Sequence, residues 1–469
     1  MVFSSIIFLL FFIPIFLLVY YCIPNNLKNT WLVIASLLFY SWGAPTFLPI
    51  LLVSCTFDFY CSLNFNNKNR KIWLTASIIS NIALLVFFKY SNFILENVNS
   101  IRFLLDGQNF TWQKVILPIG ISFLTFQKIS YLVDVYRKDC EPQVVFIDYL
   151  LFITLFPHSI AGPIVRYKEI QEQLTKRFSY INKTNIYLGL NRFIIGLSKK
   201  VLLANVLGLQ ADLVFKNYHE LTFTQTWVGA LCYTFQIYLD FSGYSDMAIG
   251  LAKMMGFKIP ENFNFPYTSK SVTEFWKRWH ITLSSWMKDY LYIPLGGNKL
   301  GNFRTYINLF LVFLFSGFWH GASWNFVIWG AFHGLFLIVE RLFLNKIILK
   351  YNILASIYTF LVVLTGWVFF RADNLHEAIT FLQKMFSFGY FDLTYLSSLN
   401  THLIAVFIMT LIFSLSPFII QNKLNSIVEK VSSNPYINLL YYILYLFLFI
   451  LCLGELFATG FNPFIYFKF

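Results

Sequence analysis

Long apolar stretches recur along this chain, and each has about the 20 residues that a helix needs to cross a lipid bilayer. Roughly 11 to 13 such stretches can be counted in the 469 residues. Charged residues make up only 12% of the sequence, whereas soluble domains carry about 25%. The stretches predict an all-α polytopic membrane protein with one membrane domain over residues 1–469, in which residues 436–469 form a last span and a tail.

The charges indicate what surrounds the chain and how it is oriented. A net charge of +13 indicates contact with anionic lipid headgroups rather than with nucleic acid. The N-terminus has no basic region and no small-residue cleavage site, so we expect a retained first span. If Lys28 and the basic turn at residues 68–71 face the cytoplasm, the N-terminus lies outside. Lys423 and Lys430 place the C-terminus outside by the same argument.

The N-terminal third also gives helix boundaries and a cysteine pattern. A turn at residues 43–45 separates two spans, and a span over residues 72–88 is followed by a polar loop over residues 91–114. No Cys-x-x-Cys spacing occurs, so neither a disulfide framework nor a metal site is predicted, and the cysteines are expected to be small packing residues. They are Cys22, Cys55, Cys61, Cys140, Cys232 and Cys452.

His320 lies at a Gly/Ser break between two apolar runs. An ionisable side chain near membrane depth is expensive to bury, and a functional site is the default hypothesis. The alternative is a histidine that bonds the backbone of a neighbouring helix. Gly317 and Gly321 would let other backbone or a substrate approach His320 closely, and their backbone N–H groups are candidate oxyanion donors. Gly330 and Gly334 form a G-x-x-x-G pair that indicates helix packing.

Two further segments carry polar groups that lipid would not tolerate. Residues 117–137 hold several polar side chains and should face a protein interior or an aqueous cavity. Lys128 is a candidate lining residue there, and a structural ion pair between Lys128 and Asp134 is favoured over catalysis. In residues 156–166 two prolines break the helix around His158, which either lines a cavity or is structural.

Asp240 and Asp246 lie within one apolar run. Six residues apart, they point to different sides of a helix, so a paired-acid mechanism is not expected. Either carboxylate could orient a histidine or close a salt bridge, and the salt bridge is favoured.

Residues 266–294 are too polar for a lipid-facing span. Ser271 followed by Glu274 is a capping box, which predicts a helix that begins there and ends before Pro294. Large apolar residues recur along it at helical spacing, with His280 among the polar residues on the other side. This pattern predicts one interfacial or re-entrant amphipathic helix, in which His280 is either incidental or functional.

Taken in chain order, these segments resemble one family, the membrane-bound O-acyltransferases, and in particular the integral-membrane subunits of bacterial alginate and peptidoglycan O-acetyltransferases. The motifs that carry the resemblance are MVFSS at 1–5, LPIGISF at 117–123, FPHSIAGP at 156–163, DFSGYSDMAIG at 240–250, EFWKRWHITLS at 274–284, DYLYIPLGGN at 289–298, FWHGA at 318–322 and WGAFHG at 329–334.

The resemblance implies a fold of tilted helices, with re-entrant or interfacial helices around a central funnel. It implies that His320 is the catalytic histidine and His280 the second signature histidine, with Asn298 a candidate lining residue. It implies an acyl group delivered from the cytoplasm, with acetyl-CoA as the donor and no bound cofactor. A histidine base suits this chemistry, and the expected partners are a polysaccharide acceptor and an extracytoplasmic SGNH-type transferase at a bacterial inner membrane.

The last six residues, FIYFKF at 464–469, admit two interpretations. They could anchor the tail at the membrane interface through their aromatic rings. They also resemble the C-terminal motif of small partner proteins in teichoic-acid D-alanylation, which implies that Tyr466 is an acyl carrier.

The sequence leaves three alternatives to peptidoglycan acetylation open. Alginate or another exopolysaccharide could be the acceptor, and a lipid acyltransferase of the same family would share His320. A secondary transporter would show an internal repeat, and none is visible in the sequence. Peptidoglycan is favoured because abundant Phe, Ile, Asn and Lys suit an AT-rich genome.

Overall fold

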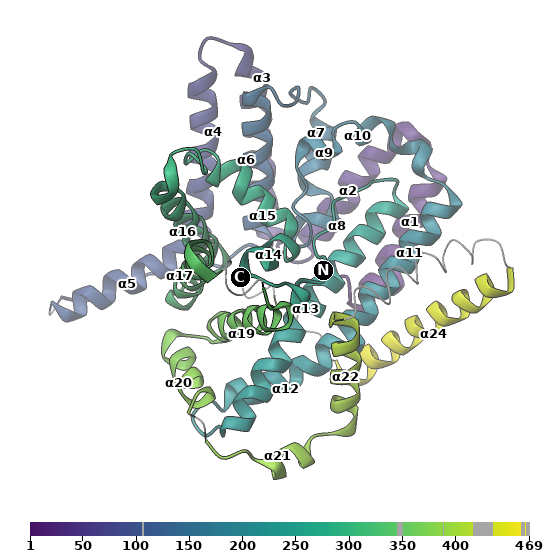
Figure 1. The fold of residues 1–469 in the computed structure, drawn as a ribbon. Coiled ribbons are helices and arrows are strands. Elements are labelled where there is room, and N and C mark those ends of the chain that lie inside the picture. The colour runs from purple at the N-terminus through teal and green to yellow at the C-terminus, as the bar shows by residue number, and fades with distance from the viewer. Residues whose placement is uncertain (106, 345–349, 388, 416–434, 461–464, 466–469) are drawn as a thin grey trace. The chain divides into compact units, whose positions relative to one another are not determined.

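The computed structural model describes residues 1–105, 107–344, 350–387, 389–415, 435–460 and 465 (Figure 1). Throughout these ranges the regular structure is helical, which confirms the all-α prediction. Among the described residues, six helical segments are long and apolar enough to cross a membrane, namely Pro45–Asn66, Arg70–Leu104, Lys183–Lys216, Trp324–Leu344, Asn352–Arg371 and Asn438–Thr459. Two shorter apolar helices are Phe8–Cys22 and Thr401–Leu415. The total of 11 to 13 spans stays a prediction.

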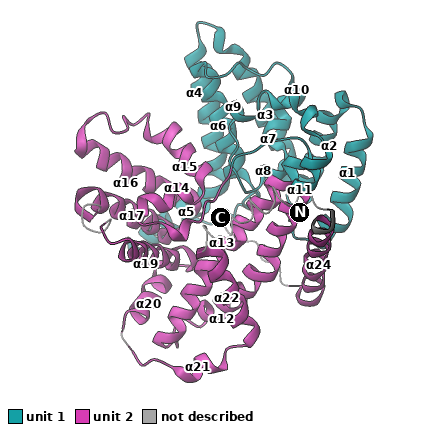
Figure 2. Ribbon diagram, turned by 45° about the vertical axis from the view of Figure 1, so that its right-hand side comes forward, with its two compact units in different colours: residues 1–189, 251–260 teal, residues 190–250, 261–469 magenta. Residues whose placement is uncertain are grey.

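Two compact units make up the chain, shown teal and magenta in Figure 2. The first unit holds residues 1–189 and 251–260, and the second holds residues 190–250 and 261–469. The single membrane domain over residues 1–469 stays a prediction.

The first unit contains the helices that precede residue 190. They are η1 (Phe8–Phe12), α1 (Ile13–Cys22), η2 (Asn25–Leu27), α2 (Lys28–Ser41), η3 (Pro45–Phe47), α3 (Leu48–Leu63), η4 (Asn64–Asn66), α4 (Arg70–Leu85), η5 (Val86–Tyr90), α5 (Ser91–Leu104), α6 (Ile121–Arg137), α7 (Phe146–Thr154), α8 (Phe156–Ser159), α9 (Tyr167–Ile170), α10 (Gln173–Lys176) and η6 (Arg177–Tyr180). Of the predicted turns, residues 43–44 and 68–69 lie between helices, whereas Pro45 begins η3 and Arg70 begins α4.

The prediction of a polar loop over residues 91–114 is wrong for residues 91–104, which are helical. There α4, η5 and α5 follow one another without a break. The apolar stretch ends at Lys89, which is buried, with its Nζ 3.2 Å from Ser122 Oγ of α6. A polar partner on a neighbouring helix therefore allows the helix to continue through a charged residue.

The helix α6 confirms that the polar segment after residue 117 faces protein. It begins after Gly120, whose φ of 77° favours glycine and where a Cβ would lie 2.9 Å from the Ser159 carbonyl. Its polar side chains are buried; they are Ser122, Gln127, Lys128, Ser130 and Asp134. The predicted Lys128–Asp134 pair is wrong: Lys128 bonds Asp58 of α3 at 3.0 Å and Asp134 meets Lys168 at 3.9 Å. Residues six apart on a helix point in different directions.

The second unit contains the remaining helices, two of which, α11 and α13, begin or end in the first unit. They are α11 (Lys183–Ser198), η7 (Lys199–Ala204), α12 (Asn205–Lys216), α13 (Phe223–Met254), η8 (Pro266–Thr268), α14 (Val272–Arg278), α15 (Ile281–Met287), η9 (Lys288–Tyr292), α16 (Gly301–His320), α17 (Trp324–Val339), η10 (Glu340–Leu344), α19 (Asn352–Arg371), α20 (Leu375–Met385), α21 (Leu393–Ser398), α22 (Thr401–Leu415) and α24 (Pro435–Thr459). The last of these is the predicted final span.

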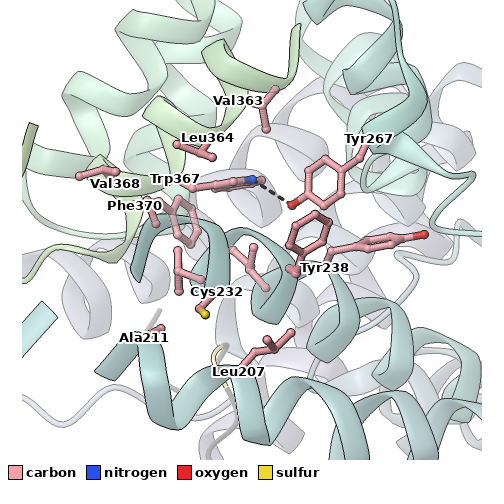
Figure 3. Close-up of a cluster of buried hydrophobic side chains, with 14 of the residues drawn as sticks. Leu207, Ala211, Cys232, Tyr238, Tyr267, Val363, Leu364, Trp367, Val368 and Phe370 are labelled. Carbon is pink, nitrogen blue, oxygen red and sulfur yellow. Dashed lines mark hydrogen bonds between the residues drawn. The ribbon is translucent and has the colours of Figure 1, made fainter. Parts of the chain in front are cut away.

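An aromatic core joins several of these helices (Figure 3). The Trp367 indole N–H donates to the Tyr267 hydroxyl at 3.2 Å, and the Tyr267 hydroxyl donates to the Thr234 carbonyl at 2.5 Å. The Trp367 ring lies 4.8 Å from Trp279 and 6.0 Å from Trp329. The core therefore ties α13, α14, α17 and α19 together through large buried rings.

Candidate active site

His320 is the last residue of α16, and α17 begins at Trp324 after a short extended break. The predicted helix break is thus confirmed. The imidazole is 4% exposed and is enclosed by rings, with centroid distances of 4.8 Å to Trp319, 5.1 Å to Trp329 and 5.2 Å to Phe370. The walls around His320 are therefore aromatic and largely apolar.

A glycine contact between α16 and α17 sets the position of His320. These helices pack side by side (Figure 1). A Cβ on Gly317 would lie 2.3 Å from the Phe326 carbonyl, and one on Gly330 would lie 2.4 Å from the Phe313 carbonyl. The glycines thus serve close backbone packing, one of the two roles expected for them. The Gly321 N–H, a candidate oxyanion donor, bonds the Gly317 carbonyl at 3.3 Å.

The single amphipathic helix expected over residues 271–293 is wrong, because the chain breaks at His280 into α14 and α15. One of the two hydrogen bonds of the predicted capping box is confirmed, since Ser271 Oγ accepts from the Glu274 N–H at 3.0 Å. His280 has a φ of 43°, which is rare for a residue other than glycine. The left-handed turn buries His280 although Lys277, one turn earlier, is exposed.

Buried aromatic residues explain why this hairpin departs from an interfacial helix. Phe275, Trp279 and Trp286 are each less than 5% exposed and pack within the second unit. The predicted ridge of large apolar side chains therefore faces protein. The Phe241 ring of α13 also packs 4.7 Å from the His280 ring.

Asn262 fixes the tautomer and orientation of His280. The Asn262 side-chain oxygen lies 3.0 Å from His280 Nδ1 and also accepts from Thr282 Oγ1 at 2.9 Å. Since that oxygen can only accept, Nδ1 of the neutral ring carries the proton and Nε2 carries the lone pair. The Asn262 amide in turn donates to Ser245 Oγ of α13 at 3.2 Å. His280 is thus held ready to accept a proton at Nε2.

Asp240 and Asp246 on α13 both form salt bridges, as predicted. Asp240 is 1% exposed, and its Oδ1 lies 2.6 Å from Lys200 Nζ. Its Oδ2 accepts from the backbone N–H of Ile465 in the C-terminal tail at 3.1 Å. Asp246 pairs with Lys199 at 2.7 Å and with Arg192 at 2.9 Å.

The remaining candidate residues belong to the first unit, to a turn of the second unit, or to the C-terminal residues that the structure does not describe. In the first unit His158 is fully buried, and the Gln127 amide donates to its Nδ1 at 2.7 Å. Lys128, also in the first unit, lines a cavity of about 40 Å³. Asn298 is exposed in a turn before α16, whereas Tyr466 lies outside the described residues.

The sequence patterns do not predict two residues that contact the candidate site residues, Asn262 beside His280 and Lys200 beside Asp240. Asn262 belongs to no recognisable motif, and only the fold brings it to His280. Lys200 did carry a signal, because two consecutive lysines inside an apolar run need carboxylate partners. Within the described ranges, no three His, Cys, Asp or Glu side chains are grouped as metal ligands.

The chain matches known proteins along its length. The profile of the MBOAT, membrane-bound O-acyltransferase family, covers residues 37–359, which include His280 and His320. The chain is 41% identical to a probable alginate O-acetylase of Pseudomonas putida over 100% of both chains. It is 40% identical to a peptidoglycan O-acetyltransferase of Helicobacter pylori, over 85% of this chain and 82% of that one. A teichoic acid D-alanyltransferase of Bacillus subtilis is 30% identical over 55% of this chain and 70% of that one.

Proposed function

Because this chain belongs to the membrane-bound O-acyltransferase family and is an acyltransferase integral to a membrane, we propose that it moves an acetyl group from a cytoplasmic donor across the membrane for O-acetylation of an exported polysaccharide. The observation that carries the proposal is the buried His320 imidazole at the break between α16 and α17, inside the segment that matches the family. The acetyl group and the polymer follow from what the relatives are named for.

In the proposed reaction His320 is the general base and acetyl-CoA is the donor. His320 takes the proton from an acceptor hydroxyl while that oxygen attacks the thioester carbonyl. The new C–O bond forms, the C–S bond breaks, and the proton passes from His320 to the departing thiolate. A positioned base of this kind contributes about 10²–10⁴-fold to the rate, and His280 assists by holding the donor or by relaying a proton through Nε2.

The acceptor hydroxyl that we propose is the phenol of Tyr466. A phenol with a pKa near 10 is mostly neutral at pH 7 and needs a base to attack. A phenyl ester keeps more of the reactivity of a thioester than an alkyl ester does, which suits onward transfer. The burial of Ile465 in the unit that holds both histidines supports a tail that reaches the site. A separate extracytoplasmic transferase, expected to be of the SGNH type, would then place the acetyl group on the polymer.

Peptidoglycan is the polymer that we propose, because the residue usage suits an AT-rich genome and one relative is a peptidoglycan O-acetyltransferase. Alginate or another exopolysaccharide is the second candidate, which the full-length match to a probable alginate O-acetylase favours. A lipid acceptor is a third, and incorporation of radiolabelled acetyl into extractable lipid instead of polymer would identify it. The location that we propose is a bacterial inner membrane with both termini outside.

The function is tested by the ester content of purified polymers from cells that carry only one variant. We expect His320→Ala to abolish O-acetyl esters on peptidoglycan while the protein remains in the membrane at wild-type level. His376→Ala, which alters an exposed histidine of α20, is the control and should leave the ester content unchanged. Normal esters with His320→Ala would remove His320 from the mechanism, and loss of esters from an exopolysaccharide alone would identify the second candidate.

A further inference from the structure

Asp240 and Asp246 lie on the same helix and meet consecutive lysines, but the two carboxylates are satisfied differently. Side chains bind both oxygens of Asp246: Arg192 bonds Oδ1 and Lys199 bonds Oδ2. Lys200 pairs with Oδ1 of Asp240, and Oδ2 accepts a main-chain N–H from Ile465 in the C-terminal tail. Cationic side chains therefore bind both oxygens of Asp246, whereas one oxygen of Asp240 binds the main chain of the tail.

The contact to the tail has two parts, a hydrogen bond and an apolar anchor. The Ile465 N–H bonds Asp240 at 3.1 Å, and Ile465 is 9% exposed within the aromatic core of the second unit. The partners are also buried, with Asp240 and Lys200 at 1% and 2% exposure. A hydrogen bond to a charged, buried acceptor is among the stronger ones that a backbone amide makes.

A π-helical turn places Lys200 beside Asp240. Lys199 and Lys200 lie in η7, a π-helical turn within the long helix from residue 183 to 216. Such turns are frequent at functional sites. Here the two adjacent lysines of the turn form ion pairs with Asp240 and Asp246, which are six residues apart on α13. Because Lys200 neutralises Asp240, the carboxylate stays compensated whether or not the tail is bound.

We propose that the Asp240–Lys200 pair is the docking site for the C-terminal tail and sets its register by binding the main chain at Ile465. Asp240 is then a positioning residue that holds the tail so that the next residue, Tyr466, can be acetylated. This role rests on the proposed function, whereas the docking itself does not. Since the site binds a main-chain N–H and one apolar side chain, it recognises a peptide segment that presents both groups.

Two matched double variants of the full-length protein separate docking from structural support. Asp240→Asn with Lys200→Met removes both charges but keeps an oxygen that can accept from Ile465. Asp240→Leu with Lys200→Met removes both charges and the acceptor. Both variants remove the same two charges, so a purely structural pair would be affected alike in both. Asp246→Asn is the control on the same helix.

The direct readout is hydrogen exchange of the Ile465 amide, measured by mass spectrometry on the C-terminal peptide. We expect wild-type exchange in Asp246→Asn and somewhat faster exchange in the Asn/Met variant, because its acceptor is neutral. In the Leu/Met variant, which has no acceptor, we expect exchange at least about tenfold faster than in the Asn/Met variant. Polymer acetylation should be lower in the Leu/Met variant than in the Asn/Met variant. The two double variants should melt at the same temperature.

Equal exchange in both double variants would overturn the proposal, whether it matched the wild type or was uniformly fast. Fast exchange with full polymer acetylation in the Leu/Met variant would refute the positioning role. Tyr466→Phe separates this proposal from the relay. If that variant still acetylated the polymer while the two double variants differed in exchange, docking would stand and the relay would fail.

Discussion

His280 holds a backbone conformation that L-residues rarely adopt, with a φ of 43°. Such a conformation costs about 1–2 kcal/mol and persists only where the surroundings enforce it. Here the Asn262 side chain and backbone enforce it, because the Ile281 N–H bonds the Asn262 carbonyl at 3.0 Å and the Asn262 side-chain oxygen meets the imidazole. Strain at a buried histidine supports a functional position for its ring.

Substitutions at residue 280 can separate the imidazole from this backbone conformation. Asparagine and glycine tolerate left-handed geometry, and alanine does not. We expect His280→Asn and His280→Gly to melt at higher temperatures than His280→Ala, by an amount equivalent to about 1 kcal/mol. All three should lower acetyl transfer about 100-fold, near the low end of an acid–base contribution.

Acetyl transfer and detergent melting temperatures, measured on the same preparations, test this prediction. If activity followed the melting temperature across the three variants, with His280→Asn nearly as active as the wild type, His280 would be structural.

At the scale of elements, the crossing of α16 and α17 places His320. Backbone atoms of the two helices meet at Gly317 and Gly330, where no side chain fits. His320 follows Gly317 by one turn, so a change in helix separation at Gly317 would move the imidazole relative to Trp329.

We expect Gly317→Ala to lower stability by about 1–3 kcal/mol, the usual cost of overpacking a core, and to lower acetyl transfer as well. The matched control is Gly454→Ala on α24, where no atom lies within 4 Å of an added Cβ. That change should raise stability by up to about 1 kcal/mol through helix propensity. An unchanged melting temperature and activity in Gly317→Ala would show that the crossing tolerates a methyl group.

The sequence predicts those elements whose boundaries depend on local signals. The helix break after His320 follows from its Gly/Ser residues, and the burial of the polar side chains of α6 follows from the cost of exposing them to lipid. The break at His280 has no glycine or proline to mark it, because Asn262 from another segment creates it. The continuation through Lys89 likewise depends on Ser122 of another helix. Sequence reasoning named His320, His280 and Asp240, whereas Asn262 required the fold.

At the scale of the whole molecule, each unit contains buried ion pairs that join its helices. In the first unit Lys128 pairs with Asp58, and Asp58 also accepts two hydrogen bonds from Asn81. In the second unit α13 carries Asp240 and Asp246 against lysines of η7. Removing one partner of such a pair leaves an uncompensated charge.

We expect Lys128→Met to destabilise the protein by about 3–5 kcal/mol, because it leaves Asp58 buried without its cation. Adding Asp58→Asn should restore most of that loss, since an amide oxygen can still accept from Asn81. Detergent melting curves of the two variants measure this difference, and polymer acetylation should recover with stability. Failure of the double variant to acetylate polymer at a restored melting temperature would assign Lys128 a role beyond structure.

We propose that His320 activates Tyr466 to take acetyl from a thioester donor. The most direct test of this step is mass spectrometry of the C-terminal peptide after incubation of the purified protein with isotopically labelled acetyl-CoA. We expect labelled acetyl on Tyr466 in the wild type, and none in Tyr466→Phe or His320→Ala. Unlabelled Tyr466 in a wild-type protein that still supports polymer acetylation, or a labelled peptide in His320→Ala, would contradict this proposal.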